Sequence, residues 1–381
     1  MASFATGPIA VFAALLLIDI GNTFNTPVGV TGQVNTAYSI AAFAFALLTG
    51  VLSVKARHKS LLLAGVLLMT ASALGCFLAS DFISLLAFYS LSGAGYAIVN
   101  PMMFTLVGEH FPLEERAKAI GRIVAGGALV YAVGAPIIAL MAGLKGWRFP
   151  LVGFVLPVLL VSLLMAFLGL PSASSRQRAS GDVKAHLRFR ELFMNTSAVA
   201  CLIGDTLRSA AFVAIVLYAP SFFRQHFLIP TEVVSLPFLG GALSYTVGSL
   251  GGSQFVNRFG RKFATVLTAL LSGMFTISYL LVPNVWISIG LMLTASWFFG
   301  MLASSANSLT LEQIPRFRGL MMSVDTAVIN MGSAFGTVVG GVALLYLNYE
   351  GLGRLLGAIG IVAAAVYFLL TKDPTAASRS L

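Results

Sequence analysis

The segment PSASSRQRASGDVKAHLRFRELFM, residues 171–194, divides the sequence into two long apolar parts. It is the longest polar stretch of the chain, and it carries the basic residues Arg176, Arg178, Lys184, Arg188 and Arg190. On both sides, windows of about 19 residues are dominated by apolar side chains, as in membrane-spanning helices. The sequence therefore predicts a basic linker between two groups of membrane helices.

Apolar stretches long enough to cross a bilayer occur on each side of this linker. Because a transmembrane helix needs about 20 largely apolar residues, we predict spans near 8–28, 35–54, 60–79, 83–108, 119–143, 149–170, 197–223, 232–256, 263–283, 286–310, 320–347 and 353–371. The predicted fold is an all-α polytopic membrane protein with 12 transmembrane helices. Residues 1–170 form one six-helix bundle, residues 171–194 the cytoplasmic basic linker and residues 195–381 the second bundle.

The composition excludes an ordinary soluble domain. Of the 381 residues, 58% are hydrophobic and only 9% are charged, whereas about a quarter of a soluble domain is charged. Most of the 23 Lys and Arg residues fall in loops that share one side of the predicted layout. The positive-inside rule then predicts a multi-pass protein of the cell membrane with both termini cytoplasmic. The net charge of +10 is explained by an anionic lipid surface, without a nucleic-acid partner.

Two pairs of loops indicate an internal duplication. EHFPLEER at 109–116 is similar to EQIPRFR at 312–318, and VKARHK at 54–59 is similar to NRFGRK at 257–262. Both pairs have the same offset in the sequence. The bundles are therefore predicted to be pseudo-symmetric copies, an arrangement common among secondary transporters.

These loops carry a resemblance to the major facilitator superfamily of secondary transporters, which has the loop motif G-x-L-A-D-R-x-G-R-R. The second copy matches at Arg258, Gly260, Arg261 and Lys262, with Asn257 in place of the acid. The first copy keeps Gly50 and Leu52 and has the basic residues Lys55 and Lys59, but it has Val54 in place of the acid and Arg57 in place of the second glycine. The resemblance implies a transporter that works by alternating access, with gating residues in these loops.

Glycines and a proline in the fifth span resemble the signature of the family's proton-coupled drug antiporters. They are Gly126, Gly127, Gly134 and Pro136. This resemblance implies proton-coupled efflux of a lipophilic or drug-like compound. The alternative is simple close packing of helices, as we also expect for Gly332, Gly336 and Gly340.

Asp19 is the main candidate for a coupling residue, because an ionisable group inside a membrane span is costly and needs a compensating role. Asn22, Thr23 and Thr26 follow at helical spacing, so we expect all four side chains on one helix face lining a cavity. The alternative is a neutral Asp19 that only joins its helix to a neighbour.

Three further charged residues lie within predicted spans. Asp205 and Arg208 are three residues apart, so they either neutralise each other or leave Arg208 to hold an anionic solute. Asp325 lies near the start of its span. It either reaches the cytoplasmic edge or pairs with Lys55 or Arg57 as a gate that replaces the acid missing at Val54.

Aromatic residues in the spans are candidates for the wall of a solute cavity. Tyr89 and Tyr96 belong to the fourth span and Trp297 to the tenth. The alternative is helix packing, since Tyr and Trp bury well when their polar atom has a partner.

The predicted function is a secondary active transporter of a small solute, with the proton as coupling ion. The alternatives are an importer or uniporter of a small organic anion and a transport-inactive scaffold or sensor. The sequence contains no G-x-S-x-G, H-E-x-x-H, phosphate-loop or dinucleotide motif, so we do not expect an enzyme, a cofactor or a metal site. We expect a monomer in the lipid bilayer.

Overall fold

The computed structural model describes residues 2–112, 115, 119, 122–123, 126–127, 129–169, 192, 194–314 and 318–373. The predicted linker at 171–194 lies outside these residues, except for Leu192 and Met194. The described part is built from helices, and none of its residues forms a strand.

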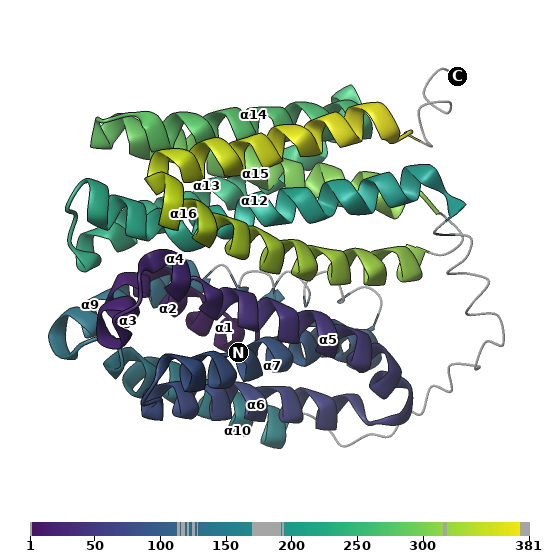
Figure 1. The fold of residues 1–381 in the computed structure, drawn as a ribbon. Helices are drawn as coiled ribbons and strands as arrows, with labels where there is room; N and C mark the ends of the chain where they lie inside the picture. Colours follow the sequence, from purple (N-terminus) through teal and green to yellow (C-terminus); the bar gives the residue numbers. More distant parts are fainter. Residues whose placement is uncertain are drawn as a thin grey trace. The chain divides into compact units, whose positions relative to one another are not determined.

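The helices of the first half correspond to the first six predicted spans (Figure 1). They are α1 (Ala2–Thr6), α2 (Pro8–Leu15), α3 (Leu17–Phe24), α4 (Val28–Thr31), α5 (Gln33–Lys55), α6 (His58–Leu78), α7 (Phe82–His110), the π-helix η1 (Val130–Gly134), α9 (Ala135–Lys145), the π-helix η2 (Leu151–Val155) and α10 (Leu156–Gly169).

The helices of the second half correspond to the other six. They are α12 (Thr196–His226), α13 (Thr231–Phe259), α14 (Arg261–Leu281), α15 (Val285–Leu311) and α16 (Arg318–Leu370). A non-helical residue interrupts α16 at Asn348, where φ is +58°, so α16 contains the last two predicted spans. Among the described residues, eight helices are long and apolar enough to cross a membrane singly. The all-α polytopic fold predicted from the sequence is confirmed.

The first span differs from the prediction because it is broken. The axis of α1 and α2 makes an angle of 63° with that of α3, and the break lies at Leu16. The helix α3 ends at Phe24, where Asn25 adopts the left-handed conformation, and Pro27 follows. Asn tolerates this conformation better than most residues, and a proline disfavours helix in the residue before it.

The fifth span contains a local widening of the helix at the predicted glycine–proline site. The π-helix η1 runs directly into α9, and the Ala135 N–H donates to the Val130 carbonyl oxygen. Pro136 has no N–H to donate, so a helical bond is missing just after this segment. The bend expected from Pro136 is thus accompanied by π-helical geometry, which is rare and usually confined to short segments.

The chain forms two compact units, which do not coincide with the two halves of the sequence. Unit 1 comprises residues 1–181 and 217–239, and unit 2 comprises residues 182–216 and 240–381. The end of α12 and the start of α13 therefore belong to unit 1. This assignment brings Arg224 of α12 into the same unit as Asp19.

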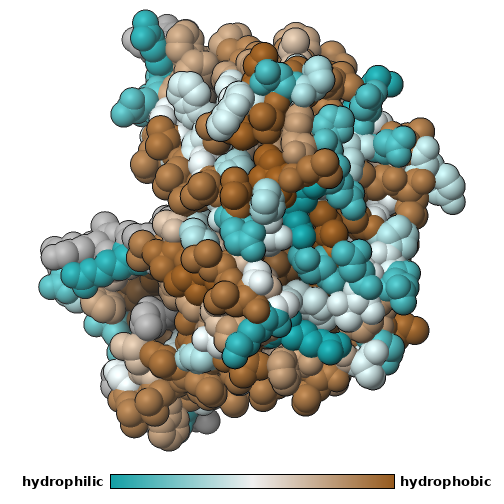
Figure 2. All heavy atoms as spheres, turned by 90° about the vertical axis from the view of Figure 1, so that its left-hand side faces the viewer, coloured by the Kyte–Doolittle hydropathy of each residue, from teal (hydrophilic) through white to brown (hydrophobic). Residues whose placement is uncertain are grey.

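Much of the surface is apolar (Figure 2). Large hydrophobic side chains remain exposed on helices of both units, among them Leu144 at 78%, Leu168 at 70%, Leu250 at 72% and Leu369 at 73%. A surface of this kind suits a lipid environment, because monomeric soluble proteins rarely expose large contiguous apolar patches.

Within unit 2, two glycines allow α16 to pack directly against α12. A Cβ atom on Gly332 would lie 2.2 Å from the Thr206 carbonyl oxygen, and one on Gly336 would lie 2.0 Å from the Ala210 carbonyl oxygen. The Ser209 hydroxyl also donates to the Ile329 carbonyl oxygen at 2.8 Å. The sequence expectation of close glycine packing is therefore confirmed for Gly332 and Gly336.

Gly336→Ala is expected to destabilise the protein by about 1–3 kcal/mol, because the added methyl group overlaps backbone that cannot move independently. Gly290→Ala in α15 is the matched control, since its Cβ would meet nothing within 4 Å. Thermal unfolding can be followed with a thiol-reactive dye, as Cys76 and Cys201 are both buried. Equal melting temperatures for the two variants would contradict the packing argument.

Asp81 begins α7 through a capping box outside the membrane span. Its carboxylate accepts from the Ser84 N–H at 2.8 Å, and the Asp81 N–H donates to the Ser84 hydroxyl at 3.4 Å. The hydrogen bond from the Ser84 backbone lowers the pKa of Asp81 below its ordinary value of 3.8. The cap is therefore strongest when Asp81 is ionised.

A lowered carboxyl pKa gives stability that is present above the unfolded-state pKa and is lost as the pH falls through the folded-state pKa. The melting temperature of the wild type is thus expected to fall more steeply below about pH 4 than that of Asp81→Asn, which caps without ionising. Parallel curves for the two proteins would show that the Asp81 charge does not contribute.

Candidate functional site

Asp19 and Arg224 form a two-pronged ion pair within unit 1. Arg224 Nη1 lies 2.5 Å from Asp19 Oδ2, and Nη2 lies 3.0 Å from Oδ1. Arg224 Nη1 also donates to the Leu15 carbonyl oxygen at 3.2 Å, at the break between α2 and α3. The Asp19 side chain is 31% exposed and that of Arg224 is 13% exposed. This bidentate geometry is the strong form of a carboxylate–guanidinium contact.

The residues expected beside Asp19 are only partly gathered around it. The Thr23 hydroxyl donates to the Asp19 carbonyl oxygen at 3.0 Å and accepts from Trp147 Nε1 at 2.7 Å, and Asn22 is exposed. The expectation that Thr26 shares this helix face is wrong, because α3 has ended at Phe24. Thr26 instead contacts the Thr31 hydroxyl of α4 at 2.9 Å.

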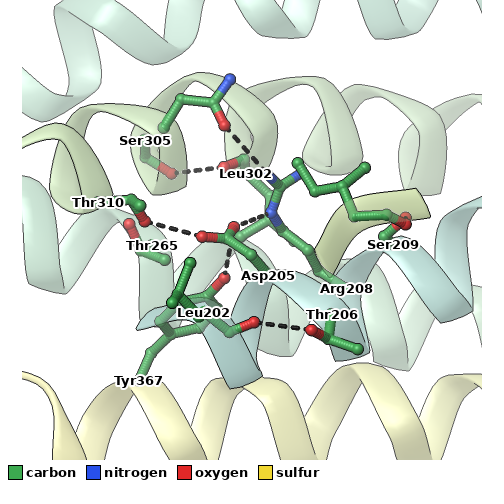
Figure 3. A network of polar contacts seen from close by, with 12 residues as sticks. Leu202, Asp205, Thr206, Arg208, Ser209, Thr265, Leu302, Ser305, Thr310 and Tyr367 are labelled. Atoms are coloured by element: carbon green, nitrogen blue, oxygen red, sulfur yellow. Dashed lines mark hydrogen bonds and ion pairs between the residues drawn. The ribbon is translucent and has the colours of Figure 1, made fainter. Parts of the chain in front are cut away.

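A second polar cluster surrounds Asp205 inside unit 2 (Figure 3). The Asp205 side chain is fully buried, and its Oδ1 accepts from Arg208 Nε and from the Tyr367 hydroxyl, the latter at 3.0 Å. Its Oδ2 accepts from the Thr310 hydroxyl at 2.7 Å. Three donors from α12, α15 and α16 thus bond to one carboxyl group, so both of its oxygens have hydrogen-bond partners, as a buried polar group requires.

The Arg208 side chain is hydrogen-bonded within this cluster. Besides Asp205, its Nη2 donates to the Asn307 side-chain oxygen at 3.0 Å, and its side chain is 12% exposed. The sequence left two roles open for Arg208, and the structure shows one of them, the local ion pair with Asp205. Asp205 balances the positive charge of this guanidinium, which weakens its attraction for a solute anion.

Asp325 lies against the same cluster. It is 1% exposed, and its Oδ1 has no hydrogen-bond partner among the described residues. Its carboxyl group interacts directly with that of Asp205 and electrostatically with Arg208. The alternative in which Asp325 extends to the cytoplasmic edge is therefore wrong for this structure. Its pairing with Lys55 or Arg57, which belong to the other unit, stays a prediction.

The aromatic candidates have different environments. Tyr89 is 1% exposed, and its hydroxyl donates to the Ile9 carbonyl oxygen at 2.8 Å, so it holds α2 against α7 as a packing residue. Tyr96 is half-buried, and its ring lies 6.0 Å from that of Tyr38, which in turn contacts Tyr89. Trp297 is 46% exposed and stacks on Phe298.

The second copy of the loop motif forms a fixed turn between α13 and α14. Gly260 has a φ of +92°, which L-residues with a side chain rarely adopt, and it precedes the first turn of α14. Arg261 Nε donates to the Ser308 hydroxyl at 2.9 Å, and its Nη2 lies 4.0 Å from Glu312 Oε1. Arg258 lies over the Phe259 ring and Lys262 over the Phe368 ring. Asn257 is an exposed residue near the end of α13.

The first copy of the motif and the fifth-span glycines lie in unit 1. Gly50 and Lys55 belong to α5, but the Lys55 side chain lies outside the described part, and Arg57 is exposed just before α6. Lys59 Nζ donates to the Phe167 carbonyl oxygen at 2.8 Å. A Cβ atom on Gly126 or Gly127 would meet Ser3 in ordinary contact, near 3.4–3.6 Å. The gating roles of these residues stay predictions.

Unit 1 also contains a cavity of about 280 Å³ lined by α1, α6, α7, α10 and residues 122–123. His110, Arg122 and Ser162 are its most polar lining residues. None of the predicted solute-binding residues lines it, so this cavity does not identify the solute site.

The most informative residue that the sequence reasoning missed is Arg224. The sequence did mark this residue as unusual, because Arg224 is one of the few basic residues that the positive-inside layout leaves outside the cytoplasmic loops. The partners Thr310 and Tyr367 had no such signal, since hydroxyl residues are frequent in these spans. Across the described residues, no group of three or more His, Cys, Asp or Glu side chains is arranged to hold a metal ion.

Comparison with known proteins gives a family match over the whole chain. The family model described as Major Facilitator Superfamily matches residues 1–248 and, in a second match, residues 209–381. A "Probable sugar efflux transporter" of Pasteurella multocida is 23% identical over 98% of this chain and 90% of its own length. An uncharacterised MFS-type transporter of Bacillus subtilis is 22% identical over 94% of this chain and 91% of its own.

Solved structures show the same fold. A D-xylose–proton symporter has a TM-score of 0.80 at 16% identity and covers 98% of this chain and 97% of its own. A bacterial homologue of the human lysosomal transporter Spinster, in an inward-facing conformation, has a TM-score of 0.78 at 17% identity, covering 97% of this chain and 94% of its own.

Proposed function

Because the chain belongs to the Major Facilitator Superfamily and is a membrane transporter rather than an enzyme, we propose that it exports a small solute in exchange for protons. The Asp19–Arg224 ion pair carries this proposal. It joins α3 to α12 through a carboxylate that is 31% exposed, and in this proposal that carboxylate is the group that binds the proton. Export rather than import is supported by the relative named as a sugar efflux transporter.

Protonation of Asp19 would convert a charge-assisted contact into a neutral one. Arg224 would then lose its counter-charge while remaining mostly buried, at 13% exposure. A buried charge without a partner is strongly unfavourable, so Arg224 and the adjoining part of α12 would move toward water or another acceptor. Loss of the proton would restore the pair. The ion pair thus provides a two-state element whose equilibrium depends on the proton.

The solute class that best fits unit 1 is a small uncharged molecule with hydroxyl groups and an apolar face. Tyr38 and Tyr96 are both half-buried, with their rings 6.0 Å apart. A phenol side chain offers an aromatic face and one hydroxyl, so it can contact both parts of such a solute. The relative named for sugar efflux supports this class over the lipophilic compounds implied by the antiporter resemblance.

Import of an organic anion is the weaker candidate. It would need a free guanidinium in the transport path, whereas Arg208 and Arg224 each bind an aspartate within their own unit. We further propose the cell membrane as the location, with both termini cytoplasmic, and a monomer as the working form.

The test uses the purified full chain in liposomes with an imposed pH gradient. The probes are a labelled neutral sugar such as D-xylose, a lipophilic cation such as ethidium, and benzoate as an organic anion. Proton antiport predicts that an acidic interior drives sugar uptake and that a protonophore abolishes it. Uptake driven by an acidic exterior would indicate symport, and no pH-dependent flux of any probe would favour a scaffold. Either result would overturn the proposal.

A further inference from the structure

Asp325 is held beside Asp205 by the packing of α16 on α12. Gly332 and Gly336 bring the two backbones together, and the Ser209 hydroxyl bonds the Ile329 carbonyl oxygen. Ile329, Gly332 and Gly336 follow Asp325 at intervals of four, seven and eleven residues, so all four lie on the face of α16 that meets α12. The position of Asp325 in the buried interior of unit 2 is therefore fixed by backbone contacts.

The cluster contains two buried carboxyl groups and one guanidinium. Arg208 and the hydroxyl groups of Thr310 and Tyr367 all bond to Asp205. Asp325 is 1% exposed, and its Oδ1 has no hydrogen-bond partner in the described part of the chain. An ionised carboxylate in this position would lack a counter-charge of its own, which costs more than binding a proton.

We propose that Asp325 is a second proton-binding residue of this transporter, neutral while Arg208 is bonded to Asp205. The inference rests on the proposed proton coupling and adds to Asp19 a carboxyl group in the other unit. When two carboxyl groups interact directly, one of them keeps its proton more readily than both ionise, because two adjacent negative charges repel each other. The cluster therefore holds one guanidinium, one carboxylate and one carboxylic acid.

Proton release from Asp325 follows from movement of Arg208. If the guanidinium shifts from Asp205 toward Asp325, the Asp325 O–H bond breaks, its proton passes to Asp205 or to entering water, and the Asp325 carboxylate takes the guanidinium. The described titratable or charged groups that interact with Asp325 are Cys201, Asp205 and Arg208 on α12, and Tyr367 of α16 bonds to Asp205. Tyr245 of α13 interacts with Arg208.

Infrared difference spectroscopy of the purified full chain tests this at pH 7. A neutral carboxylic acid and an ionised carboxylate absorb at different positions, so subtracting the spectrum of Asp325→Asn from that of the wild type identifies the form that Asp325 has. We expect the band of a neutral carboxyl group, shifted in heavy water. The matched control is Asp81→Asn, whose exposed and ionised group should give carboxylate bands only.

Carboxylate bands in the Asp325→Asn difference would overturn the proposal. Asp205→Asn is the second variant, and it keeps the test valid if Asp325→Asn folds poorly. It frees Arg208, so Asp325 should ionise and its neutral band should disappear; persistence of that band would also contradict the proposal. Asp19→Asn should leave the Asp325 band unchanged, so a failure of proton coupling at Asp19 is distinguishable from a failure at Asp325.

Discussion

Asp19→Asn is expected to lose pH-driven solute accumulation in liposomes, a decrease of about 10-fold or more, because each tenfold solute gradient needs about 1.4 kcal/mol from the proton gradient. The variant keeps the size of the side chain but cannot exchange a proton. Arg224 is then left with the Leu15 carbonyl oxygen and an amide in place of its carboxylate. The pH gradient therefore has no titratable group at this position on which to act.

The measurement compares two kinds of flux in the same liposomes. Accumulation against a gradient requires the proton, whereas exchange of labelled for unlabelled solute at equal pH does not. We expect Asp19→Asn to lose the first and to retain part of the second. Glu350→Gln is the matched control, because it also replaces a carboxylate by an amide in an arginine pair, but that pair with Arg354 is exposed at 62% and 65%. Accumulation by Asp19→Asn at the wild-type level would remove Asp19 from the coupling role.

The exchange of charges adds a second test of the same pair. Arg224→Asp alone places two carboxylates together and should abolish accumulation. Combining it with Asp19→Arg restores opposite charges, so some of the lost solute exchange should return if the contact itself matters. Independent effects of the two changes would show that Asp19 and Arg224 act separately.

The fold was predictable from the sequence because its main signal is repeated in every span. A lipid environment demands long apolar helices, and every predicted stretch contains helix in the described part of the chain. A hydropathy profile does not report local backbone conformation. The break at Leu16 and the π-helical turn before Ala135 lie inside apolar runs, where a window of about 19 residues averages them away.

The site was less predictable, because it depends on which helices meet. Asp19, Asp205 and Asp325 were identified from the cost of placing a charge in lipid, and each is partnered or buried in the structure. Their partners come from distant parts of the chain: Arg224 lies 205 residues from Asp19, and Tyr367 lies 162 from Asp205. Helical spacing along one span cannot report such pairs, and it wrongly placed Thr26 beside Asp19.

Arg208→Met is expected to lower the free energy of unfolding by about 3–5 kcal/mol, the usual effect of removing one partner from a buried ion pair. Asp205 would keep the hydroxyl groups of Thr310 and Tyr367, but it would stay fully buried without a counter-charge. The double variant Asp205→Leu, Arg208→Met removes both charges, so it should be more stable than Arg208→Met alone even though it carries an additional change.

The buried cysteines again allow thermal unfolding to be followed with a thiol-reactive dye. Arg354→Met is the control for arginine removal, because its ion pair is exposed and such pairs contribute at most about 1 kcal/mol. If Arg208→Met were no less stable than Arg354→Met, Asp205 could not be a buried carboxylate that depends on Arg208. Asp205 would then have to be protonated, and the Arg208 guanidinium would be available to Asp325 or to a solute.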